Sequence, residues 1–181
     1  MRNTRASVRD MIISLVVLLV PVVALYWFFS VEPDEPAVTA VAVAPTLAVA
    51  RAEAPFDVLA PINLPDTWKP TRVTWAKPGE TLIGERVATS HVWVLGILNP
   101  ERIYLALEQR DGKPATFIAE ATRDGKQDGA SELGRETWTR YCSADGRTRA
   151  LVLSADEVTT IVSGDTSYEG LEAYVTTLSA G

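Results

Sequence analysis

The chain has 181 residues, with 17 Lys and Arg against 23 Asp and Glu, for a formal net charge of −6. From Ser30 onward, 14 basic side chains face 22 acidic ones, a balance of −8. This charge argues against nucleic-acid binding, because a surface that binds phosphates needs clustered Lys and Arg. The length fits one modest folded domain besides an N-terminal segment.

The stretch Met11–Phe29 contains no charged residue. About 20 largely apolar residues cross a bilayer, so we predict a transmembrane helix over residues 11–30 that attaches the chain to the cytoplasmic membrane. Tyr26 and Trp27 suit the membrane–water interface. Three arginines precede the run and acidic residues follow it. The positive-inside rule therefore predicts a plasma-membrane protein with residues 1–10 in the cytoplasm and the C-terminal domain outside.

A cleaved secretory signal is the alternative to a retained anchor. Small residues at Val22 and Ala24 are compatible with cleavage after Ala24. Cleavage there would leave the apolar stretch Leu25–Phe29 as the new N-terminus, and the apolar run is longer than the core of a usual signal peptide. A retained anchor is the prediction.

Residues 31–45, VEPDEPAVTAVAVAP, are rich in Pro, Ala and acidic residues and predict an extended stalk. The extracytoplasmic domain is expected over residues 46–181, beginning with a short helix at Thr46–Ala54. The following prolines rule out a regular helix or strand through APFDVLAPINLPDTWKP. We predict an irregular strap held to the domain by its apolar side chains, Phe56, Leu59, Leu64 and Trp68.

The rest of the domain predicts an antiparallel, meander-like sheet of about six to eight strands. Apolar or alternating runs separated by Asp-Gly pairs are typical of strands joined by turns. The run His91–Leu98 is apolar on both faces and suits a central strand, and NPER after it predicts a hairpin turn. The other expected strands are Arg72–Trp75, Ile103–Gln109, Thr116–Ala121, Thr137–Cys142, Arg149–Ser154 and Val158–Gly164, with Leu82–Ala88 as a possible edge strand.

The chain ends in TSYEGLEAYVTTLSAG, which predicts a helix. Thr166 and Glu169 have the spacing of a capping box. Tyr168, Leu171, Val175 and Leu178 fall near one helical face. The expected fold class is therefore α+β: an N-terminal transmembrane helix, then one antiparallel sheet with a short N-terminal and a C-terminal helix packed on it.

Few residues suggest catalysis or metal binding. His91 is the one histidine and Cys142 the one cysteine, which disfavours a closed zinc site and excludes an intramolecular disulfide. Cys142 is expected to be a half-buried apolar residue, with an intermolecular disulfide as the alternative. His91 is expected to be structural, with a catalytic base as the alternative. No nucleotide-binding or hydrolase motif occurs, and we predict no cofactor.

The stretch Asp124–Arg135 has part of the ligand spacing of a calcium loop. Lys126 and Arg135, however, stand where two ligands belong, so we expect a solvated loop there. Asp156 and Glu157 would point to opposite faces of a strand, so they do not predict an acid–base pair.

Four tryptophans lie outside the apolar run, and core packing is the default for each. If some are exposed, they would suit a protein or glycan partner, because aromatic residues and Arg anchor interfaces. The candidates for such a surface are Trp68, Tyr104, Trp138 and Arg140.

Several segments in this order resemble a family of single-pass membrane proteins from high-GC Gram-positive bacteria, the domain of unknown function numbered 4245. They are the strap PFDVLAPINLPDTWKPT and then LGILNPERIYLALEQ, GRETWTRY, ADGRTRALVL, VTTIVSGDTS and GLEAYVTTL. The resemblance covers nearly the whole chain. It implies the membrane location and the fold, and it implies no activity or catalytic residue.

We therefore predict a membrane-anchored, non-enzymatic extracytoplasmic domain that binds an envelope protein or glycan as an accessory module, scaffold or sensor. A small-molecule or lipid carrier is one alternative, which requires a sizeable apolar cavity. A carboxylate-dependent hydrolase is another, which requires acidic side chains that converge in one cleft.

Overall fold

A computed structural model describes residues 8–29, 40–82, 84, 86–155 and 157–180 of the chain. The chain divides into two compact units, Met1–Ala37 and Val38–Gly181. Most of the predicted cytoplasmic segment 1–10, and residues 31–39 of the predicted stalk, lie outside the described residues.

The first unit contains one helix, α1, at Val8–Phe29, with Pro21 inside it. Its side chains from Met11 to Trp27 are all exposed. A search of the described part of the chain finds no helix that combines the length and the apolarity needed to cross a membrane.

The second unit begins with the predicted short helix, which is confirmed as α2 at Ala44–Glu53, with Pro45 in its first turn. Before it, the Val41 amide donates to the Pro70 carbonyl at 2.8 Å. The strap that follows is irregular except for β1 at Ala60–Pro61, which pairs with β9 at Leu178–Ser179. The predicted attachment is also confirmed: the four apolar side chains of the strap, Phe56, Leu59, Leu64 and Trp68, pack against the main core.

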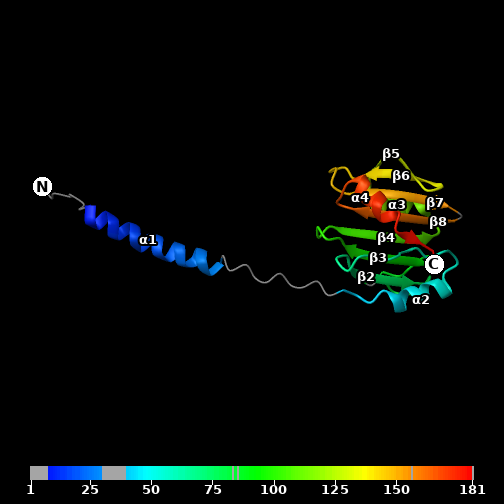
Figure 1. The fold of residues 1–181 in the computed structure, drawn as a ribbon, viewed down its shortest axis with the longest axis horizontal. Helices are drawn as coiled ribbons and strands as arrows, with labels where there is room; N and C mark the ends of the chain where they lie inside the picture. Colours follow the sequence, from blue (N-terminus) through cyan, green and yellow to red (C-terminus); the bar gives the residue numbers. More distant parts are fainter. Residues whose placement is uncertain (1–7, 30–39, 83, 85, 156, 181) are drawn as a thin grey trace. The chain divides into compact units, whose positions relative to one another are not determined.

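Seven antiparallel strands form the main sheet, which confirms the predicted antiparallel α+β domain. Figure 1 shows them in the order β5-β6-β7-β8-β4-β3-β2 from top to bottom. Their bounds are β2 Lys69–Ala76, β3 Val92–Leu98, β4 Tyr104–Asp111, β5 Lys126–Leu133, β6 Glu136–Cys142, β7 Arg149–Ala155 and β8 Val158–Gly164.

The sheet consists of two meanders rather than one. Strands β2 to β4 form the first and β5 to β8 the second, and they meet where β4 pairs with β8. The predicted turn between β3 and β4 is confirmed: the Asn99 amide donates to the Ile103 carbonyl at 3.0 Å, and Arg102 has a φ of 62°. The predicted edge strand at 82–88 includes two residues outside the described set, and among the others Val87 forms an isolated bridge with Thr81, which precedes the segment.

The prediction of a strand at Thr116–Ala121 is wrong, because this segment lies in helix α3, Pro114–Thr122. Proline is well tolerated in the first turn of a helix. One face of this helix then carries Phe117, Ile118 and Ala121, and it packs against the buried side chains of β7 and β8.

The prediction of a solvated loop at Asp124–Arg135 is also wrong, because most of it is the edge strand β5. The register of β5 against β6 shifts between Gln127 and Ala130, where Asp128 and Gly129 lie. Gly134, at a φ of 66°, turns the chain into β6. The polar sequence is compatible with a strand because nearly all of β5 is exposed at the sheet edge.

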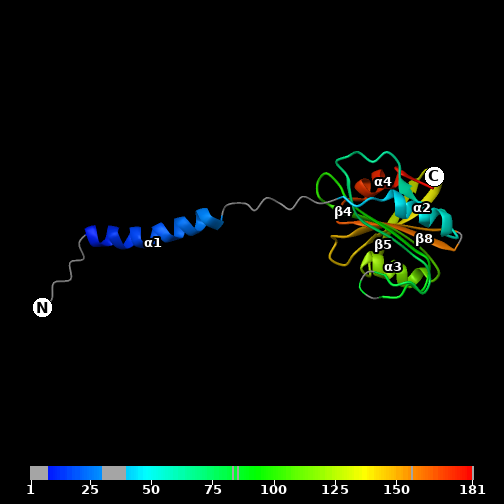
Figure 2. The same cartoon turned by 90° about the horizontal axis from the view of Figure 1, so that it is seen from below.

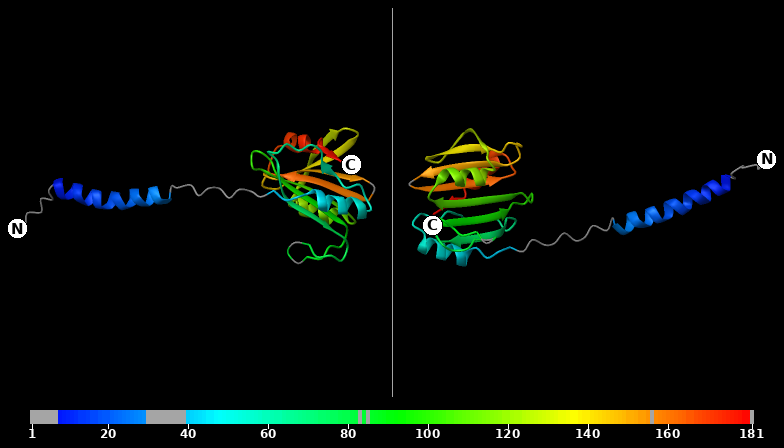
Figure 3. Two further views of the ribbon diagram at one scale, coloured as in Figure 1. Left: turned by 60° about the horizontal axis from the view of Figure 1, so that its bottom comes forward. Right: turned by 180° about the vertical axis from the view of Figure 1, so that it is seen from behind.

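The sheet has helices on both faces (Figure 2). The strap, α2 and α4 cover one face, over a core that includes Trp93, Leu107 and Leu151. Helix α3 covers the other face, where it lies across β7 and β8 (Figure 3, right). Cys142, at the end of β6, is half-buried as predicted.

The predicted C-terminal helix is confirmed as α4, Tyr168–Val175, but it is shorter than expected. Ser167 caps it by accepting a hydrogen bond from the Gly170 amide at 3.3 Å, so the cap lies one residue after Thr166. Leu171, Tyr174 and Val175 are buried against the sheet, whereas Leu178 belongs to β9.

Candidate functional site

A groove on the α3 face of the sheet is a candidate site. Two clefts of about 580 and 460 Å³ share Arg72, Glu108, Glu120 and Ala121, and so form one continuous groove. We call it the α3 groove. Its floor is formed by β2, β3, β4 and β8, and its two walls are α3 and the connection between β2 and β3.

Tyr104 lies flat on the floor of this groove because Gly96 leaves room for it. A Cβ at Gly96 would stand 2.6 Å from the Cε2 and Cζ atoms of the Tyr104 ring. The ring therefore occupies the position that any other side chain would fill. Tyr104 nevertheless stays 41% exposed, so part of the aromatic surface is open to the groove.

Arg72 lies beside this ring. It pairs with Gly96 in the register of β2 and β3, and it is exposed. Burial raises the pKa of the Tyr104 hydroxyl above its ordinary value, and the nearby positive charge of Arg72 opposes that shift. An exposed guanidinium and an exposed aromatic ring thus stand next to each other on the floor.

Two carboxylates of the groove converge on one arginine. Arg110 donates to Glu108 on the same strand at 3.1 Å and to Glu120 on α3 at 3.3 Å. The Arg110 guanidinium also lies 4.3 Å from the centre of the Phe117 ring. This arrangement holds α3 against β4.

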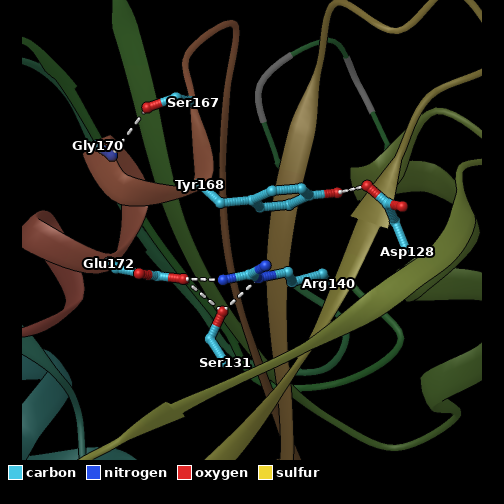
Figure 4. Close-up of polar contacts among 7 residues, drawn as sticks. All are labelled: Asp128, Ser131, Arg140, Ser167, Tyr168, Gly170 and Glu172. Atoms are coloured by element: carbon cyan, nitrogen blue, oxygen red, sulfur yellow. Dashed lines mark hydrogen bonds and ion pairs between the residues drawn. The ribbon is translucent and has the colours of Figure 1, made fainter.

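A second polar cluster lies between β5, β6 and α4 (Figure 4), and we call it the Arg140 network. Arg140 donates to Ser131 Oγ at 2.7 Å and to Glu172 Oε1 at 2.6 Å, and Ser131 also donates to Glu172 at 2.6 Å. The Tyr168 ring covers the Arg140 guanidinium at 4.8 Å, and its hydroxyl donates to Asp128 at 2.8 Å.

The Arg140 network uses its polar atoms internally. Hydrogen bonds from Ser131 and Arg140 hold the pKa of Glu172 below its ordinary value. Burial and the hydrogen bond to Asp128 raise the pKa of Tyr168. The network therefore attaches α4 to the β5–β6 hairpin, and it offers few free groups to a ligand.

The four predicted surface residues do not form one site. Trp138 is buried, and Trp68 stacks on Tyr174 with ring centres 5.8 Å apart. Both pack in the core on the α4 face, and Arg140 contacts α4. Tyr104 lies on the other face, in the α3 groove.

Sequence reasoning missed Arg72, Glu108, Arg110 and Glu120. A usable signal existed on β4, where Tyr104, Glu108 and Arg110 stand at even positions and therefore share a face. The contribution of Glu120 could not be inferred, because its segment was expected to be a strand.

His91 forms a close pair with Asp111. Its Nδ1 lies 2.7 Å from Asp111 Oδ2, and its backbone amide donates to Oδ1 at 2.6 Å. The imidazole stacks on Trp75 at 5.8 Å. These contacts join the start of β3 to the end of β4. Within the described ranges, no group of three or more His, Cys, Asp or Glu side chains is placed to hold a metal ion.

Comparison with known families identifies the chain. A family model described as a protein of unknown function (DUF4245) matches residues 4–178. The chain belongs to this family. A comparison with curated proteins finds no match. Membership in DUF4245 assigns no activity to any residue, so the roles of the α3 groove and the Arg140 network follow from their geometry alone.

Because of the Arg140 network, the stability of this DUF4245 domain should decrease at acidic pH. Because the pKa of Glu172 is lower in the folded than in the unfolded state, its contribution is present above about pH 4.5 and is lost as the pH falls through the folded pKa. Glu172→Gln should cost about 1 kcal/mol at pH 7 and flatten the acid limb of a plot of unfolding free energy against pH. Glu136→Gln, at an exposed position of β6, should change neither. An unchanged acid limb in Glu172→Gln would contradict the role of the network.

Proposed function

We propose that this protein is a membrane-anchored, extracytoplasmic accessory module that binds a component of the cell envelope without transforming it. The α3 groove carries this proposal. It is open, and it presents Tyr104 and Arg72, the residue types that anchor interfaces, side by side on a rigid sheet.

The anchor in this proposal is the Met11–Phe29 run. Its 19 residues carry no charge, and arginines precede it. The apolar side chains of α1 between Met11 and Trp27 are exposed on all sides of the helix. A helix that is apolar all round needs an apolar environment, and a bilayer provides one. The arginines favour a cytoplasmic N-terminus, which would place the folded domain outside.

The two alternatives receive less support. A carrier needs an enclosed apolar cavity, whereas the α3 groove is open and lined by charged side chains. A hydrolase needs converging carboxylates, and Glu108 and Glu120 do converge. Both, however, are bound by the Arg110 guanidinium, which leaves neither of them positioned as a free proton donor.

Photo-crosslinking in living cells tests the binding function. A photoreactive phenylalanine analogue replaces Val87, which lines the groove and is 59% exposed. We expect irradiation to give a reproducible adduct, identified by mass spectrometry after purification of the tagged full-length chain. The same analogue at Glu136, on an exposed part of β6, is the matched control. The same pattern of adducts at both positions, or no adduct at Val87, would count against a binding groove.

The same cells report the topology. A protease added to wall-stripped cells should digest the domain and spare a tag fused to the N-terminus. Protection of the domain would refute an extracytoplasmic location, independently of whether the groove binds anything.

A further inference from the structure

The geometry of the α3 groove points to its ligand class: we propose that it binds an acidic glycan, with a sugar ring on Tyr104 and a carboxylate or phosphate group on Arg72. This inference rests on the proposed binding function and specifies its partner. It follows from the charge, the floor and the dimensions of the groove.

The groove is positive within an acidic domain. Its described lining holds five arginines against two glutamates and one aspartate, a balance of two positive charges. The chain from Ser30 onward has a balance of −8. A net positive charge in a cleft raises the local concentration of anionic ligands. The arginines are Arg72, Arg86, Arg102, Arg110 and Arg123.

Arg72 is the arginine best placed to receive an anion. Arg110 engages both Glu108 and Glu120, so one of these two negative charges is balanced within the groove centre. Arg72 is exposed, its backbone is held in strand β2, and its side chain hydrogen-bonds the Tyr104 side chain. A guanidinium presents a planar set of donors that matches carboxylate and phosphate oxygens, and it is the usual choice for such groups.

Tyr104 supplies the second half of the site. Its ring lies along the sheet across Gly96 and remains partly exposed. The negative face of an aromatic ring attracts polarised hydrogens, such as the C–H groups of a sugar. An anion site beside an exposed aromatic ring thus matches a charged sugar better than it matches a simple anion.

The dimensions and polarity of the groove favour a glycan over a lipid. Clefts of about 580 and 460 Å³ lie within the range of small-ligand sites. An acyl chain needs a continuous apolar channel, whereas charged residues line both halves of this groove. We therefore assign the anionic group to a saccharide, and we treat the phospholipid headgroup as an outcome of the test.

The test uses the full-length protein in detergent micelles on immobilised oligosaccharides that carry uronic acids, phosphates or no charge. We expect retention by acidic oligosaccharides, weak retention by neutral ones, and weaker binding as salt rises, because salt screens exposed charges. Arg72→Gln should reduce the affinity for the acidic oligosaccharides at least tenfold. Arg135→Gln, which removes the same charge at an exposed position outside the groove, should leave the affinity unchanged.

Gly96→Ala tests the aromatic floor while both ligand-binding residues, Arg72 and Tyr104, remain in the sequence. The new methyl group would occupy the place of the Tyr104 ring and force it to turn away. We expect the affinity for acidic oligosaccharides to fall at least fivefold, while circular dichroism and the unfolding temperature show a folded domain. Tyr104→Phe, which keeps the ring, should retain most of the affinity.

Three results would overturn the assignment. They are equal binding of neutral and acidic oligosaccharides, tighter binding to phosphatidylglycerol vesicles than to any oligosaccharide, and no oligosaccharide binding at all. The crosslinking at Val87 separates this failure from that of the proposed function. A protein adduct at Val87 with no oligosaccharide binding would keep the binding module and reject the glycan, whereas failure of both experiments would reject both.

Discussion

Trp93→Ala should destabilise the folded domain by about 3–5 kcal/mol, the largest effect we expect from a single substitution. Trp93 is fully buried near the start of β3, and its indole N–H donates to the Leu59 carbonyl at 3.0 Å. The substitution would leave a cavity in the main core and would also remove a bond between the sheet and the strap. Since domains are stable by only about 5–15 kcal/mol, much of the total would be lost. Chemical denaturation followed by far-ultraviolet circular dichroism measures the change.

Trp93→Phe separates the two contributions. It keeps much of the buried volume but loses the N–H donor, so it should cost clearly less than Trp93→Ala. Equal losses for the two variants would mean that the hydrogen bond to the strap, rather than the packing of the core, dominates. A loss below 1 kcal/mol for Trp93→Ala would contradict the placement of this residue in the core.

Gln109→Leu should cost about 2–3 kcal/mol, the second largest effect, although leucine is apolar and of similar size. Gln109 is buried on β4 and links the strap to the sheet. Its amide oxygen accepts from the Leu59 amide at 2.7 Å, and its amide nitrogen donates to the Asp57 carbonyl at 3.1 Å and to Thr160 at 3.2 Å. Leucine would leave these partners without their hydrogen bonds. Buried polar groups that lose their partners are costly, even when the substitution adds apolar surface.

Gln127→Leu is the matched control, because Gln127 is exposed on the edge strand β5 and its side chain donates to the Tyr141 hydroxyl. It should change the unfolding free energy by less than about 0.5 kcal/mol. Proteolysis gives a second measurement for Gln109→Leu: cleavage within residues 55–68 of the strap should become faster than in the wild type. An unaltered cleavage rate together with an unaltered stability would show that the amide does not hold the strap.

The elements that could be predicted from the sequence are those whose local pattern and burial agree. The prolines of the strap exclude regular structure, and its spaced apolar residues indicate attachment, as the structure confirms. The run that forms β3 is apolar on both faces, and six of its seven residues are buried.

The wrong predictions concern segments whose surroundings override the local pattern. Thr116–Ala121 alternates enough to suggest a strand, but Pro114 begins a helix and the apolar residues then meet the sheet. The polar segment of β5 forms a strand because β6 offers it a partner, which only the folded sheet provides. The pairing of β4 with β8 joins strands that are far apart in the sequence. It could not be predicted from the short turns, which indicate only the pairing of successive strands.

The candidate site could be predicted in part. Tyr104 was singled out from its residue type, and it lies in the α3 groove. The grouping of Tyr104 with Trp68, Trp138 and Arg140 does not match the fold, because the sheet separates Tyr104 from the other three. The relation between Tyr104, Gly96 and Arg72 crosses three strands, and only the register reveals it.

The pairing of β4 with β8 also constrains the order in which the domain can fold. Leu105 pairs with Gly164, and the strands between them form the second meander. As the chain emerges during synthesis, β2 to β4 can associate early, because their contacts are local. The edge of β4 then stays unpaired until β8 has emerged. An unpaired edge strand can pair with other chains and so favours aggregation. Loss of β8 would therefore leave the edge of β4 exposed, because β8 completes the sheet that β2 to β4 begin.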